Sequence, residues 1–381
     1  MAGLRAAEAV RRSGFEGEIL VIGAEPHMPY NRPPLSKDAL QDHSALDQLT
    51  FRLSSAAAEV TWNIGKTVSS VDLDNESAEL VDGARVEWDG LVIAAGVSAR
   101  RVEIPGPQLG RYVVRTALDA MLLRQQIFQG AKVVVLGAGF IGCEVAATCQ
   151  ILGADVDVIG TGPVPLNTPL GMEFGGELQR RHERRGVRFH MNTAAAAFEG
   201  SDRVREVVLS NGTTLRADLV VEAVGTRPNT EFLEGNGLDL SDGVMCDNAM
   251  RVEGRPNVVA CGDIARFPNP MFDSIPRRVE HWNMAVETAK MAGKTVGLHL
   301  RGLEDAREDF RPVPSFWSDQ YSLRIQSFGM PVLGSADVRI LEGELSTEFA
   351  AGYHRDGELV GVVMLGLISR HAHFRNLITS I

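Results

Sequence analysis

The stretch from Ala131 to Ile159 constrains the fold of this chain more than any other. It consists of a strand, KVVVLG, a glycine-rich turn, a helical run, GCEVAATCQILG, and a second strand, DVDVIG. This order is that of a complete βαβ unit. Gly137, Gly139 and Gly142 form the pattern G-x-G-x-x-G between the first strand and the helix. The first glycine permits a tight turn, the second lets a pyrophosphate approach the backbone, and the third lets the helix pack on the strand, so the sequence predicts a dinucleotide-binding unit.

A second unit of the same design opens the chain, although only its latter half is present. A helical stretch, AGLRAAEAVRRSG, leads to the strand EILVIG, and each unit is followed by an apolar strand ending in A-x-G, at 91–96 and 220–225. Residues 67–90 alternate like antiparallel hairpins, and short strands after Arg307 indicate a third, smaller domain. We therefore expect an α/β fold with two Rossmann-like dinucleotide-binding domains and a small α+β C-terminal domain.

Composition and charge narrow the functional class. The chain has 38 Lys and Arg against 49 Asp and Glu, a formal net charge of −11, which disfavours a nucleic-acid partner because such partners require a basic surface. The cysteines at 143, 149, 246 and 261 show neither a C-x-x-C pair nor metal-ligand spacing, so we expect no metal site and no disulfide framework. No apolar run is long enough to span a membrane, and the start resembles no signal peptide. These features predict a cytoplasmic enzyme that does not contact membranes.

The sequence contains no clear signal that selects between NADH and NADPH. Gly160 occupies the position where an acidic residue would bind the ribose 2′-hydroxyl of NAD. The residues after it, Thr161-Gly162-Pro163, include no arginine that could bind the 2′-phosphate of NADP. Because nothing basic lies nearby, we expect NADH and keep NADPH as the alternative. Glu144, in the first turn of the helix, has two interpretations: a carboxylate favoured by the helix dipole, or a group that reaches the nicotinamide or flavin edge.

Several longer strings together resemble one family. They are PHMPYNRPPLSK at 26–37, LVIAAG, GAGFIGCE, VGTRPN, VVACGDIARF at 258–267, RVEHWNMAVE at 278–287 and PSFWSDQY at 314–321. These strings are similar to those of the FAD-dependent, NAD(P)H-using ferredoxin reductases that serve bacterial cytochrome P450s and Rieske-type ring-hydroxylating dioxygenases, which are related to rubredoxin reductases and apoptosis-inducing factor. The resemblance covers essentially the whole chain. R-P-P-L-S-K and F-W-S-D-Q-Y are specific to this branch of flavoproteins.

The resemblance implies a glutathione reductase-like organisation with three domains. Residues 1–107 and 236–307 would form the FAD-binding domain, residues 108–235 the NAD(P)-binding domain, and residues 308–381 the C-terminal reductase domain. The family begins with a strand and G-x-G-x-A-G, whereas this sequence starts at Met1-Ala2-Gly3, within the last part of that motif. The first strand and its G-x-G are thus absent from the sequence, and we expect either a misassigned or trimmed start or weak binding of FAD.

The resemblance also assigns site residues. The FAD contacts that it implies are Ala2 and Gly3 in the motif, Glu25 on the adenosine ribose, Val68 on the adenine side, Arg32, Lys37 and Arg115, Asp263 on the ribityl chain, and Trp282 and Trp317 beside the isoalloxazine. The other cofactor-binding candidates are Gly137, Gly139, Ile141, Gly142, Glu144 and Gly225. Lys37 and Glu144 correspond to a family ion pair beside the flavin N5 and the nicotinamide, and both are expected to be catalytic.

The absence of a suitable cysteine indicates that electrons leave the flavin to an external carrier. Disulfide reductases of similar architecture pass electrons to cysteine sulfur near the flavin, but no cysteine lies close in sequence to YNRPPLSK. The resemblance therefore implies a ferredoxin–NAD(+) reductase, in which electrons leave singly to a [2Fe-2S] ferredoxin that feeds a P450 or a Rieske oxygenase. We expect Lys37 to stabilise negative charge on reduced flavin, and Glu144 to hold Lys37 and the nicotinamide in place.

Docking of an acidic ferredoxin would require a local basic patch. Arg277-Arg278 is one candidate, whereas the cluster of Arg180, Arg181, Arg184 and Arg185 is better interpreted as a solvated helix face. Two other functions stay open. One is an NADH oxidase or peroxidase, which the lack of a placed cysteine disfavours, and the other is a non-catalytic nucleotide-binding relative of apoptosis-inducing factor.

Overall fold

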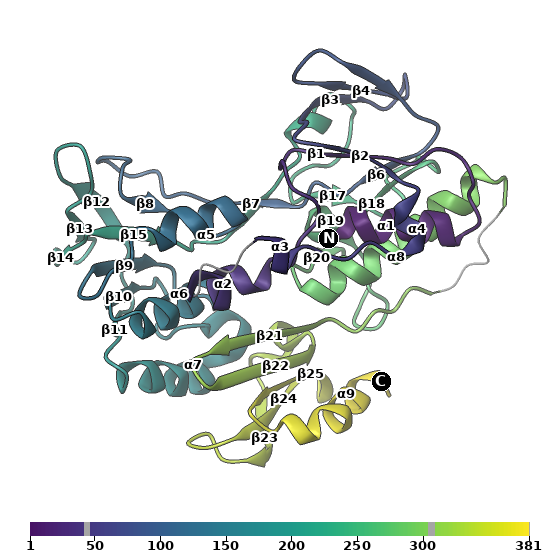
Figure 1. The fold of residues 1–381 in the computed structure, drawn as a ribbon. Helices are drawn as coiled ribbons and strands as arrows, with labels where there is room; N and C mark the ends of the chain where they lie inside the picture. Colours follow the sequence, from purple (N-terminus) through teal and green to yellow (C-terminus); the bar gives the residue numbers. More distant parts are fainter. Residues whose placement is uncertain (42–45, 304–308, 381) are drawn as a thin grey trace. The chain divides into compact units, whose positions relative to one another are not determined.

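The structure is a computed structural model and describes residues 1–41, 46–303 and 309–380. The chain folds into two compact units, each assembled from separate parts of the sequence (Figure 1). The first unit comprises Met1–Asn31, Thr50–Ser98 and Arg227–Ser315, and the second Arg32–Leu49, Ala99–Thr226 and Phe316–Ile381. Two short strands, β7 (Val97–Ala99) and β16 (Thr226–Pro228), lie where the chain passes from one unit to the other.

The first unit combines two long helices with short parallel strands. Its helices are α1 (Ala2–Arg12), α4 (Ser55–Ala58), η2 (Glu231–Leu233), η3 (Gly262–Ile264) and α8 (Trp282–Leu300). Its strands are β1 (Leu20–Gly23), β2 (Thr61–Ile64), β3 (Val68–Asp72), β4 (Ser77–Leu80), β5 (Arg85–Glu87), β6 (Leu91–Ile93), β17 (Val244–Met245), β18 (Val258–Ala260), β19 (Ala265–Phe267) and β20 (Arg277–Arg278). β1 pairs in parallel with β2, and β6 in parallel with β18. Among the described residues these pairs form two separate sheets.

Small residues let α1 and α8 approach each other closely. A Cβ atom on Gly293 would lie 2.4 Å from the Ala6 carbonyl oxygen, and one on Gly297 would lie 2.2 Å from the Ser13 hydroxyl. The alanine-rich face of α1 contributes Ala6 and Val10 to the buried core of this unit. The start of α1 is thereby held beside the ends of the parallel strands β6 and β18, since Gly262 after β18 and Ala2 are in close contact.

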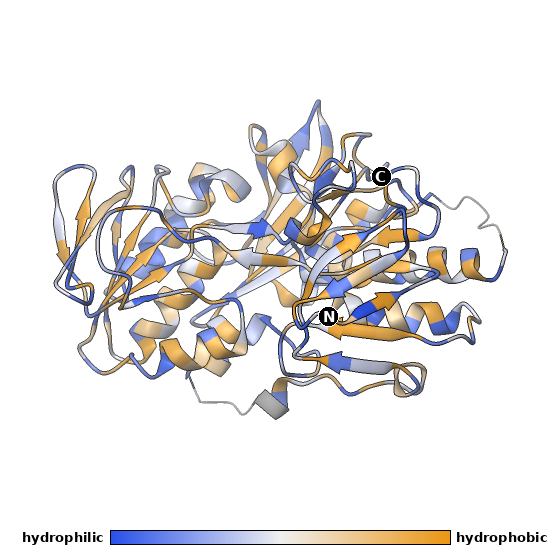
Figure 2. Cartoon of the chain, turned by 90° about the horizontal axis from the view of Figure 1, so that it is seen from above, coloured by the Kyte–Doolittle hydropathy of each residue, from blue (hydrophilic) through white to orange (hydrophobic). Residues whose placement is uncertain are grey.

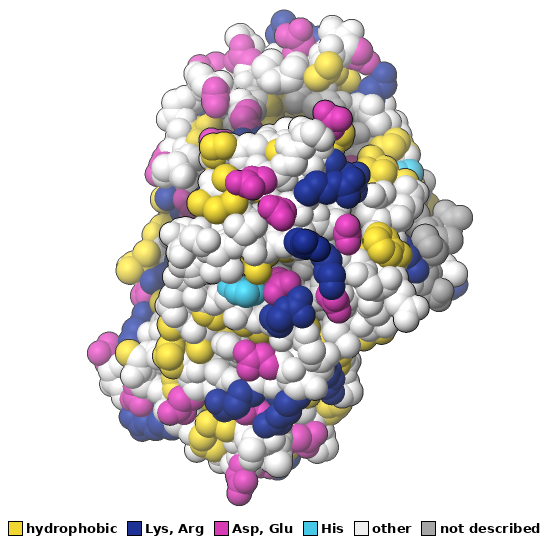
Figure 3. All heavy atoms as spheres, turned by 90° about the vertical axis from the view of Figure 1, so that its left-hand side faces the viewer, with side chains coloured by type: hydrophobic (Ala, Val, Ile, Leu, Met, Phe, Trp, Pro, Cys, Tyr) yellow, Lys and Arg dark blue, Asp and Glu magenta, His cyan; other side chains and the backbone are white. Residues whose placement is uncertain are grey.

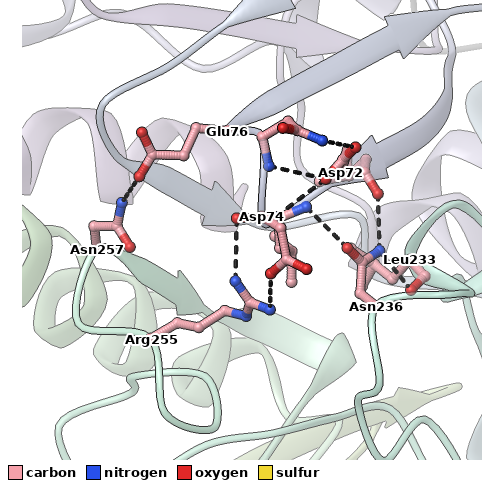
Figure 4. A network of polar contacts seen from close by, with 10 residues as sticks. Asp72, Asp74, Glu76, Leu233, Asn236, Arg255 and Asn257 are labelled. Carbon is pink, nitrogen blue, oxygen red and sulfur yellow. Dashed lines mark hydrogen bonds and ion pairs between the residues drawn. The ribbon is translucent and has the colours of Figure 1, made fainter.

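Strands β3, β4 and β5 form the antiparallel sheet predicted for residues 67–90, with Gly83 at positive φ in the turn between β4 and β5. A polar network fastens this sheet to the later part of the unit (Figure 4). The Asn236 side chain accepts from the Leu73 amide at 2.8 Å and donates to the carbonyls of Val71 and Leu233. Arg255 donates to the Leu73 carbonyl and to Asp74.

Replacement of Asn236 by alanine should lower the free energy of unfolding by about 1–3 kcal/mol, because partly buried backbone groups of the hairpin would lose their partners. Denaturant titration of the purified protein measures this change. Asn211→Ala is the matched control, since Asn211 is exposed and its side chain accepts one local turn hydrogen bond. Equal losses of unfolding free energy in the two variants would contradict the view that the Asn236 hydrogen bonds stabilise this part of the unit.

The described residues of the second unit form three sheets. Its helices are η1 (Pro33–Ser36), α2 (Asp38–Gln41), α3 (Leu46–Leu49), α5 (Ala117–Arg124), α6 (Phe140–Ile151), α7 (Asn167–Glu183), η4 (Pro331–Gly334), η5 (Ile368–Arg370) and α9 (His371–Thr379). Its strands are β8 (Arg111–Tyr112), β9 (Lys132–Leu136), β10 (Asp155–Ile159), β11 (Arg188–His190), β12 (Ala195–Glu199), β13 (Glu206–Leu209), β14 (Thr214–Arg216), β15 (Leu219–Glu222), β21 (Ser315–Gln320), β22 (Leu323–Gly329), β23 (Val338–Gly343), β24 (Phe349–Arg355) and β25 (Glu358–Leu365).

The parallel sheet of this unit has the order β11-β10-β9-β15-β8. β9, α6 and β10 confirm the predicted βαβ unit, and Val133, Val134 and Val135 of β9 are fully buried, as expected for a strand covered on both faces. Figure 2 shows that some strands are mostly hydrophobic, whereas other strands and the helices carry both hydrophobic and hydrophilic residues. The antiparallel strands predicted after Arg307 form a five-stranded sheet, β21-β22-β25-β24-β23. The α/β fold class is confirmed, and the three domain boundaries stay predictions.

Candidate functional site

The glycine turn between β9 and α6 has the geometry that a nucleotide-binding turn needs. Gly137 lies at φ +107°, and a Cβ on it would lie 2.2 Å from the Ala223 carbonyl oxygen. A Cβ on Gly142 would lie 1.9 Å from the Gly137 carbonyl oxygen, so only glycine fits there. Gly139 caps α6 without a side-chain partner and has open space where its Cβ would be. Backbone amides at the start of α6 are therefore accessible to a phosphate group.

Two other candidates flank this turn. Gly225 follows β15 at φ +98° with open space at its Cβ position. Ile141, in the first turn of α6, is 44% exposed although it is a large apolar residue. The β15 loop lies against the glycine turn, since a Cβ on Gly137 would also come within 3.3 Å of the Val224 amide. The second unit thus places Gly137, Gly139, Ile141 and Gly225 in one region, and their contacts with a nucleotide stay predictions.

Neighbouring side chains crowd Gly160 at the end of β10. A Cβ there would lie 2.6 Å from the terminal methyl of Met191, so a larger residue would displace that side chain. On the neighbouring strand β11, the basic side chains are already engaged, because Arg188 and His190 both contact Asp157. Burial acts to raise the pKa of Asp157, but Arg188 and His190 outweigh it and hold that pKa below its usual value. Arg188 and His190 are therefore committed to an internal carboxylate.

Lys37 and Glu144 form a buried ion pair. The Lys37 ammonium lies 3.0 Å from Glu144 Oε1, and the two side chains are 11% and 4% exposed. Lys37 follows η1, whereas Glu144 lies on α6 two residues after the last glycine of the turn. A carboxylate that only complements a helix dipole needs no burial, so the dipole interpretation does not account for this placement. The pairing that the resemblance implied is present.

The Glu144 carboxylate accepts hydrogen bonds from two serines as well. Ser36 Oγ donates to Oε2 at 2.5 Å, and Ser318 Oγ donates to Oε1 at 2.6 Å. Burial raises the pKa of Glu144, while the charge of Lys37 and the hydrogen bonds from Ser318, Ser36 and Lys37 oppose that rise. The carboxylate is therefore an acid whose pKa lies above its usual range and whose ionisation depends on these donors.

The loop that carries Lys37 is fixed on both sides. Two prolines begin the short helix η1, and Thr148 of α6 donates to the Ser36 carbonyl at 2.8 Å. Arg32, directly before η1, donates to the Arg115 carbonyl at 2.8 Å. Arg115 in turn precedes the capping box by which Thr116 and Asp119 start α5. Arg32, Lys37 and Arg115 are thus brought into one region of the second unit, as cationic groups suited to an anionic cofactor.

The first unit holds a second group of candidates. Gly262 lies at φ +76°, and a Cβ on it would lie 2.8 Å from the Ala2 Cβ, so the start of α1 meets the turn after β18. Gly3 faces Ala94, just beyond β6. Asp263 lies in η3, and its carbonyl accepts from Arg278 at 2.9 Å. Ala2, Gly3 and Asp263 are therefore neighbours at the carboxyl ends of parallel strands, where α/β sheets bind ligands.

The remaining candidates have separate surroundings. Trp282 begins α8, and its indole nitrogen donates to Asn31 at 3.1 Å. Glu25 accepts from the Tyr30 hydroxyl at 2.5 Å. Val68 starts β3 and packs against the core of the first unit. Trp317 is half-buried on β21, next to Ser318 on the opposite face of that strand. FAD contacts by these four residues stay predictions.

Ser36, Ser318, Gln320 and His182 are not among the site residues that the sequence predicts. Ser36 was visible within R-P-P-L-S-K, and Ser318 within F-W-S-D-Q-Y. A signal for Ser318 was available, because alternate residues of a strand point to one face. Phe316, Ser318 and Gln320 share the face of β21 that contacts α6 and α7.

All four cysteines are free and buried. Burial raises the pKa of Cys143, Cys149 and Cys261 to about 12 and also raises that of Cys246. Because the thiolate is the reactive form, these thiols are suited to packing and not to redox exchange.

The arginines proposed for partner docking have carboxylate partners within the chain. Arg277 pairs with Asp273, and Arg278 pairs with Asp242 and Glu280. On α7, Arg180 and Arg181 pair with Glu177, and Arg185 stacks on Tyr321. The face in Figure 3 shows Lys and Arg interspersed with Asp and Glu. The solvated-face interpretation of the α7 cluster fits these pairings, and Arg277-Arg278 is charge-balanced as well.

Among residues 1–41, 46–303 and 309–380, no helix has the length and apolar character needed to cross a bilayer. Within the same part of the chain, no cluster of His, Cys, Asp and Glu has the arrangement of a metal site.

Comparison with known proteins gives consistent similarities. Residues 1–289 match the family described as pyridine nucleotide-disulphide oxidoreductase, and residues 315–380 match the reductase C-terminal family. Rhodocoxin reductase of Rhodococcus erythropolis is 32% identical over 91% of this chain and 79% of its own length. The ferredoxin–NAD(+) reductase component of the anthranilate 1,2-dioxygenase system of Burkholderia cepacia is 32% identical over 95% of this chain and 88% of its own. The crystal structure of the covalent putidaredoxin reductase–putidaredoxin complex matches with a TM-score of 0.91 at 28% identity, covering 100% of this chain and 91% of that chain.

Proposed function

This chain belongs to the pyridine nucleotide-disulphide oxidoreductase family, in the branch of the ferredoxin–NAD(+) reductases, and we propose that it passes electrons from NADH through FAD to a [2Fe-2S] ferredoxin. The relatives named for rhodocoxin, putidaredoxin and a dioxygenase system support an oxidoreductase that serves a P450 or a Rieske oxygenase. The four cysteines are free thiols, as in proteins of a reducing compartment, which supports the cytoplasmic location that we propose.

The observation that carries this proposal is the buried Lys37–Glu144 pair directly beside the glycine turn. FAD, when bound, accepts a hydride from NADH and releases electrons one at a time. Lys37 supplies a fixed positive charge that stabilises negative charge next to it, which is worth more in a buried site than in water. Glu144 holds the Lys37 ammonium in place and excludes water from it, since both side chains are nearly inaccessible.

The residues present fit the two cofactors. The open space at Gly139 and Gly225 and the uncapped start of α6 suit the pyrophosphate of a nicotinamide dinucleotide. For FAD, we propose contacts from Arg32, Lys37 and Arg115 of the second unit. The other proposed FAD contacts are Ala2, Gly3, Glu25, Val68, Asp263, Trp282 and Trp317. The close contact of Gly262 with Ala2 holds the start of α1 against the turn after β18, where the proposed contacts Ala2, Gly3 and Asp263 lie.

We propose NADH as the donor, as the sequence predicts. Gly160 provides no acid for the ribose, but the neighbouring basic side chains that would be needed for a 2′-phosphate are engaged by Asp157. A phosphate that entered this region would meet that carboxylate instead of a free cation. The preference for NADH therefore comes from the lack of a positive partner and not from a dedicated acid.

The two alternative functions are weighed by the same features. An NADH oxidase or peroxidase of this architecture would need a reactive cysteine near the flavin, and the high pKa values of the buried thiols disfavour one. A non-catalytic nucleotide-binding protein would have no need for a lysine and a glutamate buried together at a cost in desolvation. Both features favour the reductase.

Reduction of a [2Fe-2S] ferredoxin tests the proposal. Purified protein supplied with FAD should bleach ferredoxin absorbance when NADH is added. With NADPH in place of NADH, the rate should be at least about tenfold lower, because a 2′-phosphate without a polar partner costs about 1.4 kcal/mol of binding free energy. Oxygen consumption without ferredoxin measures the oxidase alternative in parallel. NADH turnover that is independent of ferredoxin would contradict the proposal, and a colourless protein that does not bind FAD would favour the non-catalytic alternative.

A further inference from the structure

A buried series of hydrogen bonds leads away from Glu144 to helix α7. Ser318 Oγ lies 2.6 Å from Glu144 Oε1, Gln320 Nε2 lies 3.0 Å from Ser318 Oγ, and His182 Nε2 lies 2.7 Å from Gln320 Oε1. Ser318, Gln320 and His182 are all fully buried. Nothing in the proposed chemistry so far uses Gln320 or His182.

Strand and helix periodicity produce this arrangement. On β21, alternate residues face the helices: Phe316 packs on Phe140, and Ser318 contacts Glu144. Phe140 and Glu144 are four residues apart on α6 and thus lie on one face of that helix. The next residue on the β21 face, Gln320, contacts His182 on α7. One strand of the C-terminal sheet therefore aligns with two helices of the same unit.

The direction of every hydrogen bond in the series is fixed by the charge at one end. An ionised Glu144 only accepts, so the single hydroxyl proton of Ser318 points to it. The Ser318 oxygen must then accept from the Gln320 amide group, which turns the Gln320 carbonyl toward His182. That carbonyl requires a proton on His182 Nε2. All three bonds donate toward the carboxylate.

The surroundings of His182 agree with this direction. Burial lowers the pKa of His182 to about 4, so the imidazole is neutral at pH 7 and carries one ring proton. Among the described residues its Nδ1 atom has no hydrogen-bond partner, which suits an unprotonated nitrogen better than a buried N–H group. The ring packs edge-on against Tyr321 and Phe189. Rotation of the ring is therefore restricted by its neighbours.

We propose that Ser318, Gln320 and His182 are positioning residues that hold the Glu144 carboxylate ionised and directed at Lys37 by a one-way series of donors. This inference rests on the proposed function, because it assigns the series to the reaction that Lys37 and Glu144 support. A hydrogen bond to a charged acceptor is stronger than one between neutral groups, and adjacent donors reinforce it in a buried site. The position of the Glu144 carboxylate thereby accounts for the burial of three polar side chains, Ser318, Gln320 and His182.

Other charged groups near the series are few. Glu144 faces Lys37 from the loop after η1 and the neutral thiol of Cys143 on its own helix. His182 is influenced by Arg185 on α7, which disfavours a second positive charge, and lies against Tyr321. Loss of the Ser318 donor should therefore act mainly on the Glu144–Lys37 pair.

The first test compares variants of the FAD-containing protein by the pH dependence of flavin reduction by NADH. Ser318→Ala removes a donor that holds the pKa of Glu144 down, so the acidic limb of the profile should move up by about one pH unit. Gln320→Leu should move it in the same direction by less. Ser327→Ala is the matched control: Ser327 is a buried serine on the adjacent strand β22 whose hydroxyl has no partner among the described residues. The control should leave the profile unchanged.

The second test observes the protonation of His182 directly, with a His182→Gln variant to identify its signal among the nine histidines. Nitrogen-15 NMR of the histidine-labelled protein, with and without FAD, should show His182 with the proton on Nε2 and a bare Nδ1. The opposite tautomer would overturn the one-way series, as would an unchanged acidic limb in Ser318→Ala. Failure of the proposed function is distinguishable, since the wild-type protein would then show no flavin reduction by NADH while the tautomer of His182 remained measurable.

Discussion

Substitution of Lys37 by alanine should slow the reduction of bound FAD by NADH by about two orders of magnitude, the usual loss when one fixed charge or donor is removed from a buried site. The Lys37 ammonium lies 3.0 Å from Glu144, and both side chains are nearly inaccessible to water. Without it, the donors that remain to Glu144 among the described residues are the hydroxyl groups of Ser36 and Ser318. Its already raised pKa should then rise further, so the site loses its positive charge and the anionic form of Glu144 together.

Stopped-flow bleaching of the yellow flavin band measures this effect directly. Lys66→Ala is the matched control, because Lys66 pairs with Asp82 at 2.6 Å in an ion pair that is about half exposed, of the kind that contributes little. A bleaching rate for Lys37→Ala within a factor of two of the wild type would remove Lys37 from the mechanism.

Alanine substitutions at two glycines of the same turn should have different effects, one on NAD binding and the other on protein stability. Gly139 has a negative φ and open space at its Cβ position, so Gly139→Ala should fold normally. The added methyl group would project where a pyrophosphate approaches the backbone, and we expect the dissociation constant for NAD to rise at least about tenfold. Gly142→Ala instead places its Cβ 1.9 Å from a backbone oxygen and should destabilise the protein by about 1–3 kcal/mol.

Calorimetric titration with NAD and thermal unfolding of the same samples separate these effects. Normal NAD affinity in Gly139→Ala would show that the turn does not hold the pyrophosphate. An unfolding temperature of Gly142→Ala equal to that of the wild type would show that helix α6 shifts freely, contrary to the close contact with Gly137.

Local patterns in the sequence determined most of the fold class. The βαβ unit at 131–159, the hairpins at 67–90 and the antiparallel strands after Arg307 all appear where periodicity and glycine turns predict them. These features depend on neighbours in sequence, such as strand alternation and turn residues. The lack of a redox cysteine was also readable, since cysteine spacing requires no structure.

Tertiary structure alone decided what surrounds Glu144. Its donors Lys37, Ser36 and Ser318 come from segments more than a hundred residues away from it, and no periodicity links them. The same holds for the charge balance of Arg277 and Arg278, which looked basic in sequence but meet Asp273 and Asp242 in the fold. Ionisation depends on burial and on charges within a few ångströms, and sequence order does not fix either of these.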